Sequence, residues 1–130
     1  MVKSYTSKEQ SEMLIKLGIP IETADMEYMF LKKDRSKVSN VPFVKDGFEE
    51  PECCYIFTPC WSLAALRACL PPGISIDGIL YVFESHNTFD NEWVYEYKFE
   101  DISAPLYSKS LNEIDAAVDM IIQLKENKMI

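Results

Sequence analysis

Four cysteines and one histidine are the residues of this 130-residue chain that could carry metal or nucleophilic chemistry. They are Cys53, Cys54, Cys60, Cys69 and His86. Cysteine zinc sites usually contain Cys-x2-Cys pairs, and the sequence has no such pair. We therefore expect no bound metal and no other cofactor, and we expect the cysteines to pack as small apolar side chains.

Cys60 is the strongest candidate for a nucleophile. Thr58-Pro59 is typical of a helix start, and the first turn of a helix lowers the pKa of a thiol. His86 could then act as the general base in a cysteine-dependent enzyme. The Cys60-Trp61 dipeptide also occurs in papain-like proteases, but the glycine-rich sequence around their cysteine is missing here. The simpler interpretation is a packed thiol and a solvent-exposed histidine on a hairpin connection.

The charge is acidic and unevenly distributed. A net charge of −8 disfavours nucleic-acid binding and docking on anionic membranes, both of which depend on Lys and Arg. Residues 32–45 nevertheless carry a net charge of +4, and residues 84–101 carry −5. These segments are solvated faces or complementary patches that pair chains or hold a partner; the acidic one could also imitate DNA. The candidate patch residues are Lys32, Lys33, Arg35 and Lys37, and Glu92, Glu96, Glu100 and Asp101.

The sequence predicts a cytoplasmic protein with free thiols. The longest uninterrupted apolar run, Ile79–Phe83, is far shorter than the roughly 20 residues that span a bilayer. The first ten residues lack the apolar core of a signal peptide. Disulfides are rare in the cytoplasm, so the cysteines are expected to stay reduced.

Local signals place helices and strands along the chain. Ser7 and Gln10 form a capping box at the start of a helix that Gly18 ends. Later, aromatic residues at every second position of 93–100 predict a strand with its rings facing inward and Glu96 facing outward. The complete prediction is helix 7–17, strand 26–31, a possible strand 38–44, a short strand 53–57, helix 58–70, strand 79–84, strand 93–100 and helix 110–130.

The terminal helix and the aromatic strand together specify a helix packed on a sheet. Ser110 and Glu113 form a second capping box, and Ile114, Val118 and Ile121 lie on one helical face. Asp77-Gly78 is a turn signal, and strands 79–84 and 93–100 that follow it are connected as an antiparallel hairpin. We therefore predict one α+β domain, residues 1–130, in which helices cover a small antiparallel sheet of four to five strands.

Several segments also resemble a known group of proteins. They are the helix Trp61-Ser-Leu-Ala-Ala-Leu, the aromatic strand 93–99 and the terminal helix with Asp115-Ala-Ala. In this order they resemble a family of short, uncharacterised proteins encoded by prophages and mobile elements of gut bacteria. The family has no assigned activity, so the resemblance supplies no catalytic residues. It implies a small module that modulates a host. In such proteins the terminal helix often has an aromatic residue near the position of Gln123, and this chain departs from that pattern.

We predict a non-enzymatic protein-interaction module that binds another protein or forms a homodimer. Two alternatives remain open: an enzyme that uses Cys60, and a small-ligand domain with a pocket beside Trp93 and Tyr95. A third use of the aromatic strand, as a platform on which bases stack, requires nearby cations, whereas its outward neighbours are mostly acidic. Core packing explains the aromatic residues better.

Overall fold

The computed structural model describes residues 4–31, 33, 41–44 and 55–130. In these residues the chain forms three α-helices, one 3-10 turn and two antiparallel sheets, which confirms the α+β class. The elements in chain order are α1 (Lys8–Lys16), η1 (Ile21–Thr23), β1 (Met26–Leu31), β2 (Phe43–Val44), β3 (Tyr55–Cys60), α2 (Leu63–Cys69), β4 (Gly73–Ile76), β5 (Ile79–Asn87), β6 (Trp93–Phe99), β7 (Ile102–Ser110) and α3 (Glu113–Glu126).

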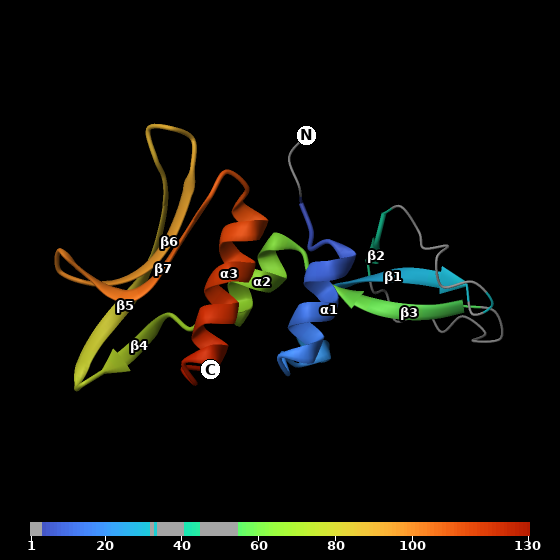
Figure 1. Ribbon diagram of the computed structural model, residues 1–130, viewed down its shortest axis with the longest axis horizontal. Helices are drawn as coiled ribbons and strands as arrows, with labels where there is room; N and C mark the ends of the chain where they lie inside the picture. Colours follow the sequence, from blue (N-terminus) through green and yellow to red (C-terminus); the bar gives the residue numbers. More distant parts are fainter. Residues whose placement is uncertain (1–3, 32, 34–40, 45–54) are drawn as a thin grey trace.

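The two sheets lie at opposite ends of the molecule, with the three helices between them (Figure 1). One sheet has the order β4-β5-β6-β7 and matches the small helix-covered sheet that the sequence predicts. The other has the order β2-β1-β3 and was not anticipated as a separate sheet. Strand 26–31 is confirmed as β1, whereas residues 38–40 and 53–54 of the two neighbouring predicted strands lie outside the described residues.

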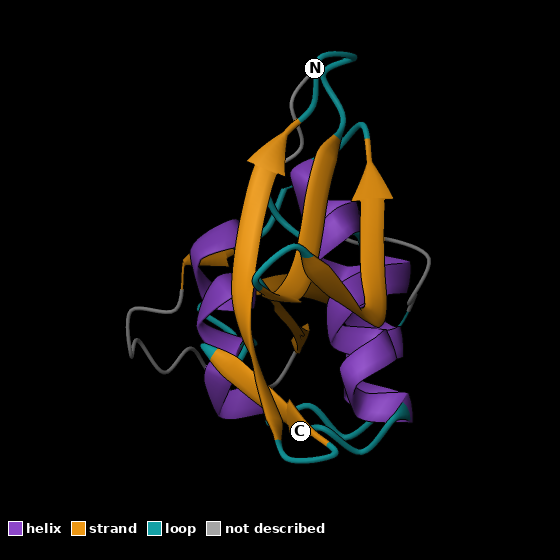
Figure 2. Ribbon diagram, turned by 90° about the vertical axis from the view of Figure 1, so that its left-hand side faces the viewer, coloured by secondary structure: helices purple, strands orange, loops and turns teal. Residues whose placement is uncertain are grey.

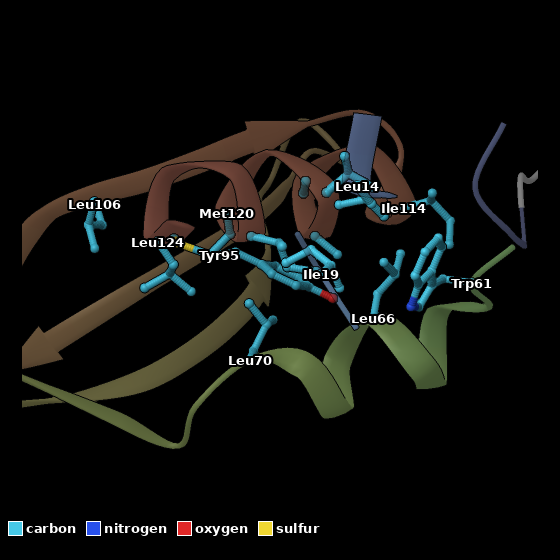
Figure 3. Packing of buried hydrophobic residues seen from close by; sticks show 14 of the residues in the cluster. Leu14, Ile19, Trp61, Leu66, Leu70, Tyr95, Leu106, Ile114, Met120 and Leu124 are labelled. Atoms are coloured by element: carbon cyan, nitrogen blue, oxygen red, sulfur yellow. The ribbon is translucent and has the colours of Figure 1, made fainter. Parts of the chain in front are cut away.

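Helix α3 packs directly on the aromatic face of β6. Tyr95 and Tyr97 are fully buried, and Phe99 at the end of the strand is 42% exposed. Figure 3 shows Tyr95 reaching from the sheet into the space between α2 and α3. The prediction that the rings face the terminal helix is therefore confirmed. The buried face of α3 is wider than predicted and includes Met120, because α3 contacts α1 and α2 as well as the sheet.

Tight turns connect the strands of the larger sheet. Asp77 and Gly78 have φ values of 52° and 81°, and they join β4 to β5 as the turn signal in the sequence predicts. Positive φ at both central residues is typical of the hairpin turn that Asp-Gly favours. Strand β5 extends to Asn87, so His86 lies on the strand and not in the hairpin connection.

Strand β7 was not predicted, because the sequence analysis placed no helix or strand between strand 93–100 and helix 110–130. Pro105 argues against a central strand here, because proline lacks the N–H that such a strand needs. Here β7 is an edge strand with an irregular register opposite Glu96 and Lys98, where a missing N–H is tolerated. The free edge is also covered: the Gln123 side chain donates to the Tyr107 carbonyl at 2.8 Å and accepts from its N–H at 3.2 Å.

Two predicted helix starts are also wrong. Thr58, Pro59 and Cys60 belong to β3, and the N-cap of α2 is Ser62, which accepts from the N–H of Ala65. Pro59 is tolerated in β3 because β3 is an edge strand of its sheet. At α3 the strand continues through the predicted cap Ser110.

The N-cap of α3 is Asn112, whose side chain accepts from the N–H groups of Ile114 and Asp115. By contrast, the capping box of α1 is formed as predicted, with both of its reciprocal bonds between Ser7 and Gln10.

Candidate interaction surface

Cys60 is fully buried at the end of β3. Its thiol donates to the backbone carbonyl of Thr6 at 3.4 Å and lies 3.5 Å from the Thr6 hydroxyl. Burial raises the pKa of Cys60, which disfavours the thiolate that a nucleophile needs. Hydrogen bonds with Thr6, Ser11 and Tyr28 act in the opposite direction, but burial has the larger effect on the pKa of Cys60.

The thiol is one member of a buried polar network centred on Thr6. The Thr6 hydroxyl accepts from the Trp61 N–H at 3.1 Å and lies 2.8 Å from the Ser11 hydroxyl. The Thr6 carbonyl also accepts from the Tyr28 hydroxyl at 2.8 Å. The network ties the N-terminal segment to α1 and to the smaller sheet, so Cys60 has a structural role there.

His86 is exposed on β5, in the other sheet from Cys60. The structure does not bring the two candidate catalytic residues together, and it gives no support to cysteine-dependent catalysis. Among the residues that the structure describes, no group of three or more His, Cys, Asp or Glu side chains could hold a metal ion. Cys53 and Cys54 lie outside those residues.

A polar cluster that the sequence did not reveal joins α2 and α3 to the larger sheet. Arg67 on α2 pairs with Glu113 at 2.9 Å and donates to the Ser85 hydroxyl at 3.2 Å. Tyr95 donates to the same Glu113 carboxylate at 2.6 Å. Burial, followed by this carboxylate, raises the pKa of Tyr95. These contacts connect α2, α3 and the larger sheet. The sequence had instead assigned Glu113 to a capping box.

The acidic patch is divided and partly neutralised. Lys98 lies 3.9 Å from Glu84 and 3.6 Å from Glu96, and Lys109 lies 3.5 Å from Glu92. Glu96 faces outward as predicted but is only 5% exposed.

Glu100 and Asp101 lie in the β6–β7 turn, away from these pairs. Such a dispersed set does not support imitation of a phosphate backbone. In the basic patch, Lys33 is exposed, and Lys32, Arg35 and Lys37 lie outside the described residues.

Tyr95, beside which the ligand-binding alternative places its pocket, is fully buried in the core cluster. A small hollow lies instead between α1 and the smaller sheet, with a volume of about 170 Å³. It is lined by Lys8, Glu12, Phe30, Ile56 and Thr58. The Lys8 ammonium lies 4.9 Å from the centre of the Phe30 ring.

The outer face of the larger sheet exposes several large apolar side chains. None of the described helices lies over this face, which is turned toward the viewer in Figure 2. Leu80 and Val82 on β5 are 59% and 55% exposed, and Tyr107 on β7 is 46% exposed. This face, defined by Leu80, Val82 and Tyr107 with the Glu84–Lys98 pair, is called the open face below.

Comparison with family models, curated proteins and solved structures gives no significant match for this chain. The resemblance to prophage-encoded proteins therefore stays a prediction. No helix in the described part of the chain combines the length and apolar character that crossing a bilayer requires.

Proposed function

We propose that this chain is a non-enzymatic protein-interaction module and that the open face is its contact surface. The observation that carries the proposal is the apolar run Ile79–Phe83 on a strand covered on one side only. Tyr81 and Phe83 pack against the core, whereas Leu80 and Val82 point to solvent. A strand with one solvated face normally alternates, and a continuous apolar run is typical of strands buried on both faces. The sequence of β5 thus favours a second cover.

The surroundings of the apolar pair are those of an interface. Lys98 stands opposite Val82 in the strand register, and Glu84 follows Val82 by two positions on the same face. Protein interfaces commonly have an apolar centre and a polar rim, and aromatic residues such as Tyr107 are enriched in them. The open face has this composition without requiring any catalytic group.

The nature of the partner follows from the resemblance. A small acidic module of prophage type acts on proteins of the host cell, so a cytoplasmic host protein is the expected partner. The two polar clusters, the buried one around Thr6 and the partly exposed one around Glu113, would then serve only to hold the module rigid.

The test is capture of a partner by the intact chain, followed by measurement of the affinity for that partner. Leu80→Thr with Val82→Thr removes the apolar pair and keeps residues that suit a strand. Loss of two interface anchors should weaken binding by a factor of 10 or more, equal to about 1.4 kcal/mol. Leu111→Thr is the matched control, because Leu111 is 75% exposed and precedes α3 outside the open face. Equal affinities of the double variant and the control would overturn the proposal.

A further inference from the structure

The tip of the β5–β6 hairpin presents a phenylalanine entirely to solvent. Phe89 is 104% exposed, the highest value among the large apolar residues described. The turn is fixed without help from the ring: the Thr88 N–H donates to the Glu92 carbonyl at 2.7 Å, and the Asn91 N–H donates to the Thr88 carbonyl at 3.0 Å. The Thr88 hydroxyl also accepts from the Glu92 N–H at 3.1 Å. Because folding of the hairpin does not require the ring, its presence at the tip needs another explanation.

A fixed tip is well suited to binding. Ordering a loop or a side chain on association lowers affinity, and a pre-formed turn avoids most of that loss. A rigid aromatic side chain that enters a pocket is the usual form of an interface anchor. The feature to identify is therefore a pocket of matching size and charge.

The hollow beside α1 has a suitable size. An enclosed apolar cavity of about 150 Å³ is known to take up benzene. The hollow beside α1 has a similar volume, about 170 Å³, and therefore has room for a phenyl group, but it is partly open to solvent and its lining is part polar. Phe30 and Ile56 supply apolar contacts, and the Lys8 ammonium is positioned to interact with an aromatic face, as it already does with Phe30.

The charges of the two features are complementary. Asp90 follows Phe89 directly and supplies a negative charge next to the ring, whereas Glu92 further along the turn is already paired with Lys109. Lys8 lines the hollow, and exposed Lys33 lies just beyond the end of β1, the strand that contains Phe30. Glu12 also lines the hollow and would repel Asp90. The attraction between the tip and the hollow therefore depends on the Lys8 ammonium. Complementary charge of this kind selects a partner and fixes its orientation.

We propose that the Phe89 tip of one copy of this chain inserts into the Lys8–Phe30–Ile56 hollow of a second copy. The hairpin and the smaller sheet lie at opposite ends of the molecule, so a chain cannot fill its own hollow (Figure 1). The contact is therefore heterologous, with different surfaces on the two copies, and it allows head-to-tail addition of further copies. It deepens the proposed interaction function by naming one partner, and it uses a surface other than the open face.

The first experiment is sedimentation equilibrium of the intact chain from about 10 μM to about 1 mM, the range expected for a small interface. The weight-average mass should rise with concentration for the native chain. Phe89→Ser should reduce the association constant at least tenfold, and the chain should remain folded because the ring contributes nothing to the hairpin. Leu111→Ser, at another exposed position, should associate like the native chain.

A mixing experiment tests the head-to-tail geometry. Lys8→Glu alters the hollow and leaves the tip intact; an acid at the start of α1 is compatible with the helix dipole. Phe89→Ser alters the tip and leaves the hollow intact. Each variant alone should be largely monomeric, whereas an equimolar mixture should form a dimer and no longer chains. Combining Lys8→Glu with Asp90→Lys should restore association through exchanged charges.

The results separate this inference from the proposed function. A native chain that stays monomeric to 1 mM, or association that Phe89→Ser leaves unchanged, would overturn the inference, and either leaves the binding test of the open face intact. Association lost in Leu80→Thr/Val82→Thr but kept in Phe89→Ser would also overturn it, because the open face would then be the self-contact.

Discussion

Replacing Thr6 by valine tests whether the polar network around Cys60 is structural. Valine has nearly the same shape as threonine but removes the hydroxyl, which is fully buried. The Trp61 N–H, now bonded to that hydroxyl at 3.1 Å, would lose its side-chain acceptor. Ser11 would keep its bond to the Ser7 carbonyl at 2.8 Å, so its hydroxyl would remain satisfied.

The magnitude follows from the single orphaned donor. A buried donor without a partner costs about 1–3 kcal/mol, so we expect Thr6→Val to lower the free energy of unfolding by about 2 kcal/mol. For a domain of this size the melting temperature should fall by roughly 6–10 °C.

Urea unfolding followed by tryptophan fluorescence is a direct assay, because Trp61 is fully buried and borders the substituted site. Thr58→Val is the control, since Thr58 is half-buried on β3, the strand that ends at Cys60. A difference between the two variants smaller than about 0.5 kcal/mol would refute the structural role of the Thr6 hydroxyl, because it would leave no orphaned donor to account for.

Two further predictions concern the sheet edge and alkaline pH. Gln123→Ala should expose the backbone of Tyr107 on the β7 edge, so hydrogen exchange at the Tyr107 amide should accelerate at least tenfold while exchange in β6 stays the same; equal rates in both proteins would contradict the edge-covering role. Burial raises the pKa values of Tyr28, Tyr95 and Tyr97 above 10.0. Above pH 10 the unfolded chain therefore binds fewer protons than the folded one, and the urea midpoint should fall as the pH rises above about 9; the buried Cys60 thiol, whose pKa is also raised, adds to this fall. Tyr97→Phe should make that fall shallower, and a midpoint independent of pH up to 11 would contradict the prediction.

Elements with strong local signals were predicted well. The capping box at Ser7 and the alternation of 93–99 each involve residues close in sequence, so they act before any tertiary contact forms. The bounds of β1 and the Asp77-Gly78 turn were correct for the same reason.

The errors arose where tertiary context outweighed a local signal. Proline argues against a strand, but Pro59 and Pro105 both lie in edge strands, where the missing backbone N–H leaves no neighbouring strand without a donor. Which strands are edges depends on the assembled sheets, and one sequence does not determine that order. The second sheet was missed because it depends on the pairing of β1 with β3, two strands that are far apart in sequence.

The candidate sites were less predictable than the fold. The sequence drew attention to Cys60 as a residue type with reactive chemistry, but reactivity depends on burial and neighbours, which place Cys60 in a structural network. Glu113 illustrates the reverse case. It was assigned a local capping role, and its actual partners, Arg67 and Tyr95, are 46 and 18 residues away in sequence.

Comparing the outward-facing residues of β5 and β6 shows which of them folding requires and which it does not. Both strands share the open face, on which β6 places Val94 and Glu96, only 2% and 5% exposed, and the partly exposed Lys98. Across the hairpin, β5 places Leu80 and Val82 on the same face. Polar residues there would support the same register and the same core, so stability of the single chain does not explain the choice. Departures from a pattern that the rest of the element obeys are expected at functional sites. By this reasoning, a partner should be sought on β5, not at Cys60, whose surroundings are fully explained by folding.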